Sequence, residues 1–340
     1  MLRQILVPLD GSVLAEMALP NAVAMARATA SSLILLQVVP SPSHNRPAAW
    51  GMARSAVPEN HKEEANAAQA YLWGIEGQLR AERIEVTSRV REGDPAKVIV
   101  SEAAYDPSIT LIVMSTHGRS GLGRWFFGSV SEKVLHASPI PLLLVRPEGG
   151  EEAARRSHKD TYSTIMVPLD GSALAEQALR EARLLAIATG ATLVLVSSTQ
   201  RLSIGSMSMY MEAASYQLYA DAWQEERDRL TGYLQEKADS LRADGLRVKT
   251  RIAQGQLAEV ILKAVEQIES DLVIMSTQGG GSSNALQGLQ DLLLGSVALK
   301  VVQEAGLPVL LIPVREAPLP QKRTDESIEA SVEMRAGAVR

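Results

Sequence analysis

Short apolar runs alternate along the chain with longer stretches in which apolar residues recur at helical spacing. In the first half, Val, Ile and Leu fill consecutive positions of each run, which is typical of strands buried on both faces of a sheet. The predicted strands are 4–9, 32–39, 85–91, 110–115 and 141–145. The predicted helices between them are 12–30, 62–83, 95–105 and 128–137. This strict alternation predicts an α/β fold with a doubly wound parallel sheet and right-handed crossovers.

The second half of the chain repeats the pattern. Its predicted strands are 164–169, 192–197, 247–252, 272–276 and 308–312, and its predicted helices are 172–189, 215–244, 257–269 and 292–304. Pro8-Leu-Asp10-Gly-Ser12 returns as Pro168-Leu-Asp170-Gly-Ser172, an offset of 160 residues. A period of this length indicates a duplicated domain, because solenoid repeats are far shorter.

The polar segments of the chain divide it into parts. We predict two tandem five-stranded domains, 1–147 and 162–315, joined by a charged linker at 148–161. Residues 316–340 are charged and contain prolines, which predicts a mobile tail. Residues 40–60 contain four prolines and little periodicity, so they are either a lid or partner-binding loop or a disordered insertion.

Composition excludes several classes of function. The net charge of −5 offers no electrostatic footprint for nucleic acid, so we expect no nucleic-acid partner. The absence of cysteine excludes disulfides, thiol catalysis and cysteine-based metal sites. We expect no membrane partner, since no apolar run reaches the roughly 18–20 residues of a membrane span. No signal peptide is recognisable, so we expect a cytoplasmic protein.

A glycine-rich segment lies between the predicted strand 110–115 and the predicted helix 128–137. Backbone N–H groups of such a turn and of a helix N-terminus together form an anion site. Ser129 and Ser131 add hydroxyl donors, and Arg119 and Arg124 add positive charge. From these residues alone, a phosphate-binding loop and a tight strand-to-helix connection are equally consistent with the pattern.

Other nucleotide motifs do not fit this segment. Arg124 and Trp125 follow Gly123 where a Walker A loop needs Lys and Ser or Thr, and the first strand ends in Asp10-Gly11-Ser12 rather than a dinucleotide fingerprint. Asp10 could contact a nucleoside, accompany Mg²⁺ or supply charge at a helix start, and Ser12 is the expected N-cap. His117 shows no metal-ligand spacing with the other histidines, so we expect it to face solvent or to bond the backbone.

These motifs resemble those of a tandem member of the universal stress protein family, over roughly residues 1–147 and 161–315. The family's nucleotide motif is Gly-x2-Gly-x9-Gly-Ser/Thr. Gly118, nine residues and Gly128-Ser129 match its second part, while Ser115 stands at the first glycine. The resemblance implies a Rossmann-like, adenine nucleotide alpha hydrolase-like fold that binds ATP or another adenine nucleotide, with or without Mg²⁺.

The resemblance also implies which residues form the site. Asp10 and Pro8 would contact the nucleoside, and Val38 would meet adenine. The residues implied at the ribose and phosphates are Met114, Ser115, Gly118, Arg119, Gly121, Gly128, Ser129, Val130 and Ser131. Because Ser115 stands where the motif has its first glycine, we expect the nucleotide site to be reshaped or weakened.

The second copy departs further from the motif. Gly279 and Gly295 enclose fifteen residues instead of nine, and Gln278 replaces His117. We therefore expect weak or no nucleotide binding there. The second domain would act mainly as a pseudo-symmetric partner of the first, although it retains the motif residues Asp170, Gly279, Gly295 and Ser296.

The sequence thus predicts an adenine-nucleotide-binding protein with a regulatory or stress-response role and no dedicated catalytic chemistry. Weak ATP hydrolysis is the most that we expect. The alternative is a nucleotide-independent scaffold whose apolar runs 141–145 and 308–312 add edge to edge across domains or chains. Either reading predicts a homodimer or an intramolecular pseudo-dimer.

Overall fold

The structure is a computed structural model, and it describes residues 4–41, 59–117, 127–146, 161–199, 213–280 and 294–314. Four sequence predictions therefore fall wholly or mainly outside the described residues. They are the linker at 148–161, the tail at 316–340, most of the loop at 40–60, and the glycine-rich segment from Gly118 to Phe126.

The first half forms a parallel sheet with the strand order β3-β2-β1-β4-β5. Its strands are β1 (Gln4–Leu9), β2 (Ser32–Val39), β3 (Val86–Glu92), β4 (Ile109–Ser115) and β5 (Leu142–Val145). Its helices are α1 (Val13–Glu16), α2 (Leu19–Thr29), α3 (Glu59–Ala81), α4 (Pro95–Tyr105) and α5 (Ser129–Ala137). Parallel pairing agrees with the predicted doubly wound α/β fold.

Side-chain alternation divides the core between the two faces of this sheet. Ile5 and Leu33 pack on one face with α2 and α3, while Leu6 and Ile34 pack on the other with α4 and α5. Successive residues of a strand point to opposite faces, so both faces become apolar when every position is apolar. The near-continuous Val, Ile and Leu runs are the reason that helices cover the sheet on both sides.

The second half repeats this architecture with the strand order β10-β9-β6-β7-β8. Its strands are β6 (Thr164–Pro168), β7 (Thr192–Thr199), β8 (Arg247–Gln254), β9 (Leu272–Ser276) and β10 (Val309–Ile312). Its helices are α7 (Ala173–Thr189), α8 (Ala213–Ala243), α9 (Leu257–Ile268) and α10 (Ser296–Glu304).

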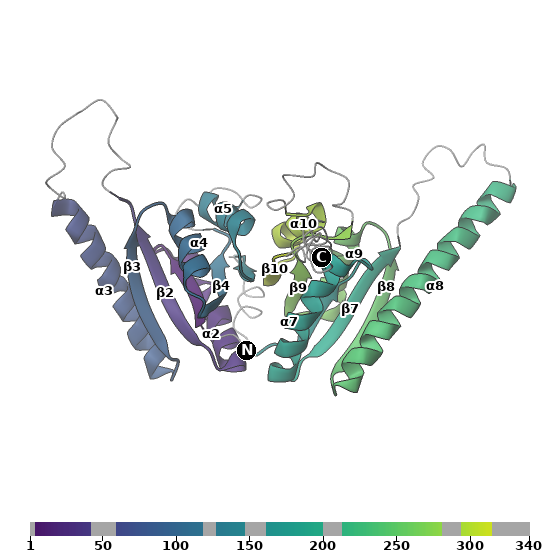
Figure 1. Ribbon diagram of the computed structural model, residues 1–340, viewed down its shortest axis with the longest axis horizontal. Helices are drawn as coiled ribbons and strands as arrows, with labels where there is room; N and C mark the ends of the chain where they lie inside the picture. Colours follow the sequence, from purple (N-terminus) through teal and green to yellow (C-terminus); the bar gives the residue numbers. More distant parts are fainter. Residues whose placement is uncertain are drawn as a thin grey trace, which may run out of the picture.

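The two halves join through an antiparallel seam between β5 and β10. Leu143 lies opposite Leu310, and the pairing makes one ten-stranded sheet from the two five-stranded sets. Figure 1 shows the two lobes on either side of this seam, with α3 and α8 on the outer flanks. Near the seam, the buried Tyr162 hydroxyl donates a 3.3 Å hydrogen bond to Asn21 Oδ1 of α2. The apolar runs therefore add edge to edge within the chain, which gives an intramolecular pseudo-dimer.

One helix that the sequence predicts as continuous is interrupted in the structure. The sequence predicts a single helix at 12–30, but α1 ends at Glu16 and α2 begins at Leu19. Pro20 lies in the first turn of α2, where its missing N–H costs nothing, whereas inside a continuous helix it would remove a hydrogen bond and clash with the preceding turn. The equivalent position in the second half is Arg180, and α7 runs there without interruption.

Candidate functional site

A cavity of about 270 Å³ opens at the point where the strand order of the first half reverses. After β1 the chain crosses to β2 on one side, and after β4 it continues to β5 on the other, so the connections leave the carboxyl ends of these neighbouring strands in opposite directions. Such switch points are the usual binding crevices of open α/β sheets. The apolar lining includes Pro8, Leu36, Val38, Ile99, Met114 and Val130, and the polar lining includes Asp10, Ser115, His117, Gly128, Ser129 and Ser131.

The structure gathers the described members of the predicted site around this cavity. They are Pro8, Asp10, Val38, Met114, Ser115, Gly128, Ser129, Val130 and Ser131. Gly118, Arg119 and Gly121 lie outside the described residues. The sequence missed Leu36 in the second half of β2, and Pro95 and Ile99 in the first half of α4. Their positions at the carboxyl edge of the predicted sheet were the available signal.

The N-terminus of α5 forms the polar end of the cavity. Gly128 caps the helix without a side-chain bond, so the first N–H groups of α5 lack intrahelical partners and carry the positive end of the helix dipole. The Gly128 N–H donates to Thr116 O at 2.8 Å, which ties the helix start to the end of β4. A Cβ at Gly128 would lie 3.3 Å from that carbonyl oxygen, so this close approach favours glycine.

Ser131 does not act as the sequence predicts. Its hydroxyl lies 2.7 Å from Thr116 O and 2.8 Å from Gly128 O, and its one proton is directed to these carbonyl oxygens. The side chain is buried and braces the turn between β4 and α5. Ser131 therefore offers a ligand its backbone N–H, and the predicted hydroxyl donor is wrong.

Asp10 lies at the opposite wall, at the end of β1. Its Oδ1 accepts hydrogen bonds from the backbone N–H of Ser12 at 2.9 Å and from the Ser12 hydroxyl at 2.6 Å. Ser12 in turn caps α1 by accepting the Ala15 N–H at 3.2 Å, which confirms its predicted N-cap role. This chain of bonds holds the carboxylate in a defined orientation beside the cavity.

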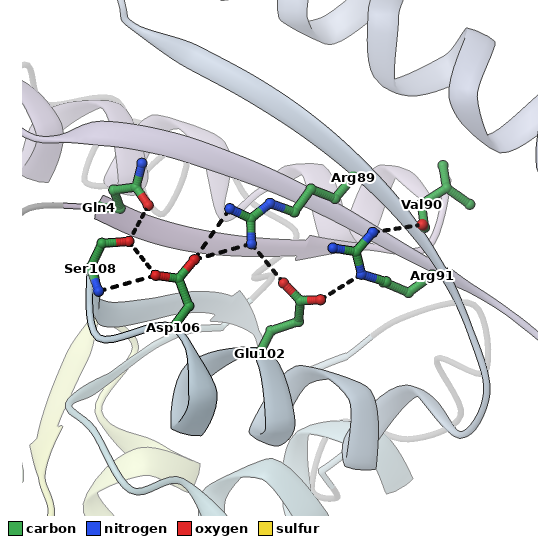
Figure 2. Close-up of polar contacts among 7 residues, drawn as sticks. All are labelled: Gln4, Arg89, Val90, Arg91, Glu102, Asp106 and Ser108. Carbon is green, nitrogen blue, oxygen red and sulfur yellow. Dashed lines mark hydrogen bonds and ion pairs between the residues drawn. The ribbon is translucent and has the colours of Figure 1, made fainter.

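Charged side chains fix α4, which supplies the wall at Pro95 and Ile99. Arg89 of β3 donates to Glu102 at 2.7 Å and to Asp106 at 3.3 Å, and Arg91 donates to Glu102 at 2.5 Å (Figure 2). Burial alone would raise the pKa of Glu102, but the hydrogen bonds and charges of Arg91 and Arg89 outweigh it and lower that pKa. The cluster anchors α4 to the sheet behind the cavity.

Two residues at the end of β4 complete the polar wall. The backbone N–H of His117 donates to Ser115 Oγ at 3.2 Å, and His117 Nδ1 lies 3.0 Å from Thr116 Oγ1. Among the described residues, the buried Nε2 of His117 has no hydrogen-bond partner. The ring of His117 therefore contacts a neighbouring side chain and lines the cavity, rather than facing solvent or bonding the backbone as the sequence predicts.

The equivalent aspartate of the second half is engaged by its own glycine-rich loop. Asp170 Oδ1 accepts both Ser172 donors at 2.9 and 2.6 Å, and Oδ2 accepts the Gly280 N–H at 2.8 Å. A Cβ at Gly279 would lie only 2.5 Å from Asp170 Oδ2, so the backbone reaches the carboxylate because this residue is glycine.

The described ranges hold neither a metal-binding cluster nor a membrane-spanning helix. Within these ranges, no group of three or more His, Asp or Glu side chains could hold a metal ion. No helix of the described part is both long and apolar enough to cross a bilayer.

Comparison with known proteins identifies the family. The profile of the Universal stress protein family matches residues 1–146 and 161–313. A universal stress protein of Mycolicibacterium smegmatis is 24% identical over 312 residues, covering 91% of this chain and 96% of the relative. One of Synechocystis is 29% identical over 150 residues, covering 42% of this chain and 97% of the relative.

Solved structures extend the likeness over both halves. The crystal structure of a universal stress protein from Archaeoglobus fulgidus matches with a TM-score of 0.64 at 19% identity, covering 91% of this chain and 98% of that one. A functionally unknown protein from Pseudomonas aeruginosa matches with a TM-score of 0.61 at 18% identity, covering 99% and 97%. These likenesses show a shared fold. The chain belongs to the universal stress protein family, as a tandem member with two copies of the family domain.

Proposed function

We propose that the cavity of the first domain binds an adenine nucleotide, with ATP as the ligand to test first, and that this binding serves a regulatory or stress-response role. The observation that carries the proposal is the division of one cavity into an apolar part and an anion-binding end. Pro8, Val38 and Met114 form an apolar wall suited to a purine base, and α5 presents its N-terminus at the other end.

The site chemistry favours binding over a dedicated catalytic step. Asp10 is the only carboxylate among the described residues that line the cavity, and its Oδ1 already accepts two hydrogen bonds from Ser12. Mg²⁺ entering with ATP would take most of its ligands from phosphate oxygens and water, with Asp10 as the candidate protein ligand. Binding to the folded state alone stabilises that state by mass action, and a partner could then recognise it.

We propose one nucleotide per chain. In the second domain, the Gly280 N–H already occupies Asp170 Oδ2, and the loop backbone lies against the carboxylate. The longer spacing between Gly279 and Gly295 supports the same assignment, because added residues displace the donors of a phosphate loop. The second domain then acts as the structural partner across the β5–β10 seam.

Calorimetric titration of the full-length protein with ATP, AMP and adenosine tests this proposal. The expected result is saturable ATP binding with one site per chain, and adenine nucleotide released when the purified protein is denatured. No released nucleotide and no heat at millimolar ATP would replace the proposal by the nucleotide-independent scaffold. Two sites per chain would contradict the assignment to the first domain.

Matched charge variants test where the phosphates bind. Ser129 and Ser296 are both exposed first residues of their helices, α5 and α10. Glutamate at either position complements the helix dipole and preserves stability. Ser129→Glu should weaken ATP binding about tenfold or more through repulsion, with little change for adenosine. Ser296→Glu should leave both affinities unchanged, and an equal loss in the two variants would rule out α5 as the phosphate site.

A further inference from the structure

The edge strand β8 carries a row of cations on one face. Arg247, Lys249 and Arg251 alternate with Val248 and Ile252, which pack against the core on the opposite face. Side chains at alternate positions of a strand share a face and lie about 7 Å apart. Because β8 is the last strand in the sheet order and pairs only with β7, the cation row lies at the outer border of the second domain (Figure 1).

The cation row has no carboxylate to neutralise it in the described part of the chain. Arg247 donates a hydrogen bond to Gly190 O. Arg251 donates one to Gln267 Oε1 of α9. Both acceptors are neutral, and a guanidinium has five N–H donors, so each arginine keeps its charge and further donors. Among the described residues, neither these arginines nor Lys249 forms an ion pair.

The edge strand of the first domain, β3, has its charges balanced on the same face. The strand registers make Arg89 of β3 equivalent to Arg251 of β8. Arg89 and Arg91 form ion pairs with Glu102 and Asp106 of α4 (Figure 2). The first domain therefore supplies carboxylates to its own cations from the helix packed beside the strand.

The helix beside β8 does not supply these carboxylates. Ala264 and Ile268 of α9 stand at the positions of the two acidic residues of α4. Glu259 of α9 lies 3.8 Å from Lys300 of α10, on another side of the helix. Glu266, two turns further along α9, shares the side of Glu259 because of the helical spacing. The cations of β8 are thus left for an acidic group from outside the domain.

We propose that the cation row of β8 is the docking site of an extended, acidic segment of a partner protein, which supplies the carboxylates that α9 lacks. An extended segment with acidic residues at alternate positions repeats the spacing of the row, since both chains have the same rise per residue. Such charge complementarity steers association and selects the partner. Charged side chains also protect sheet edges from aggregation, but this protection does not require the loss of carboxylates, because β3 keeps both of its own. The docking site does not depend on the proposed nucleotide binding.

Fluorescence anisotropy of labelled peptides with the full-length protein tests the docking site. The probe peptide alternates glutamate with threonine, an isomer of the same composition carries its glutamates in one block, and a third peptide has lysine in place of glutamate. We expect saturable binding of the alternating peptide at low salt, weaker binding of the block isomer and no binding of the lysine peptide. The affinity should fall as the salt concentration rises, because salt screens exposed charges.

Removing the cation row should remove this binding. The variant that combines Arg247→Gln, Lys249→Gln and Arg251→Gln should bind the alternating peptide about tenfold more weakly or less. Glutamate at the same three positions should exchange the preference, so that this variant binds the lysine peptide. The matched control removes equal charge from exposed residues of α3, α4 and α7 and should bind as wild type does; its substitutions are Lys62→Gln, Lys97→Gln and Arg180→Gln.

Each contrary result overturns a defined part of the proposal. No binding of the alternating peptide by wild type, or an equal loss in the control variant, would leave the cations with edge protection alone. Equal affinity for the block isomer would overturn the extended alignment. A single-stranded oligonucleotide that bound more tightly than the peptide, and was lost in the glutamine variant of the row, would replace the protein partner by nucleic acid. Thermal melting of each variant confirms folding before titration.

Discussion

Asp10 and Asp170 are equivalent residues that share one structural task and differ in a second. Each accepts the backbone N–H and the hydroxyl of the serine two residues on, with the same distances of 2.9 and 2.6 Å in both domains. This common arrangement orders the start of α1 or α7. Asp170 also accepts the Gly280 N–H of its own loop through Oδ2, whereas Asp10 lines the cavity of the first domain. The pair therefore allows a structural role to be separated from a ligand role.

Alanine at each aspartate makes this separation measurable. Asp10→Ala and Asp170→Ala should each lower the free energy of unfolding by about 1–2 kcal/mol, because each removes hydrogen bonds to a charged acceptor. Urea unfolding measures that change. Only Asp10→Ala should also weaken ATP binding in calorimetry. Loss of ATP affinity in Asp170→Ala alone would place the ligand in the second domain.

At the scale of single elements, α4 is held to β3 by ion pairs whose carboxylates are replaced by apolar residues at the equivalent positions of α9. Glu102 and Asp106 of the first domain correspond in the sheet and helix register to Ala264 and Ile268 of α9. The hydrogen bond from the Ser108 hydroxyl lowers the pKa of Asp106, and the nearby Arg89 lowers it further. Lowered carboxylate pKa values mean that the folded state favours the ionised form, so this cluster stabilises the fold when ionised.

The cluster predicts a pH-dependent contribution to stability. The ordinary pKa values are 4.5 for Glu102 and 3.8 for Asp106. Because the folded values are lower, the stabilisation is present above these values and is lost as pH falls through the folded ones. Glu102→Gln should lower the free energy of unfolding by about 1 kcal/mol at pH 7, and the difference from wild type should shrink below pH 4.5.

Chemical denaturation at a series of pH values measures this difference. Glu266→Gln replaces an exposed carboxylate of α9 that forms no ion pair with another described residue, so it is a suitable control and should show a flat difference. If the difference in unfolding free energy between Glu102→Gln and wild type stayed constant down to pH 3, it would contradict the role assigned to the ion pairs.

The elements themselves were largely predictable, and the exceptions have physical reasons. β1, β2, β9 and α4 have the predicted bounds because unbroken apolar runs or clear caps such as Asp94 mark them. The break before Pro20 was missed because apolar periodicity continues across it, although the proline itself was a signal. The inward turn of the Ser131 hydroxyl was not predictable, since it depends on carbonyl oxygens of Thr116 and Gly128 that only the fold brings together.

At the scale of the whole molecule, the seam couples the stability of the two domains. Leu143 and Leu310 pair across it and are both buried, so unfolding one domain would expose the edge of the other. Both edges are pairing candidates from the sequence alone, which leaves open whether they pair within one chain or between chains. In the structure, β5 pairs with β10 of the same chain, in antiparallel register.

A buried charge in the seam should uncouple the domains. Leu310→Asp places an unpaired carboxylate in an apolar site, which costs several kcal/mol. We expect calorimetry to show one thermal transition for wild type and two for the variant, with ATP raising only the first-domain transition. Leu241→Asp in α8 is a buried substitution away from the seam, and it should lower one joint transition without dividing it. A single transition in Leu310→Asp would contradict the coupling.

Because both seam strands belong to one polypeptide, the sequences of the two domains can diverge independently. A tethered partner is present at an effective concentration of about millimolar, so β5 meets β10 however scarce the protein is. In a dimer of two identical chains, every copy has the same sequence, so each would have to retain both the pairing strand and the ligand site. In the tandem chain, β10 needs only to present its edge, and the loop around Asp170 can diverge while the seam persists.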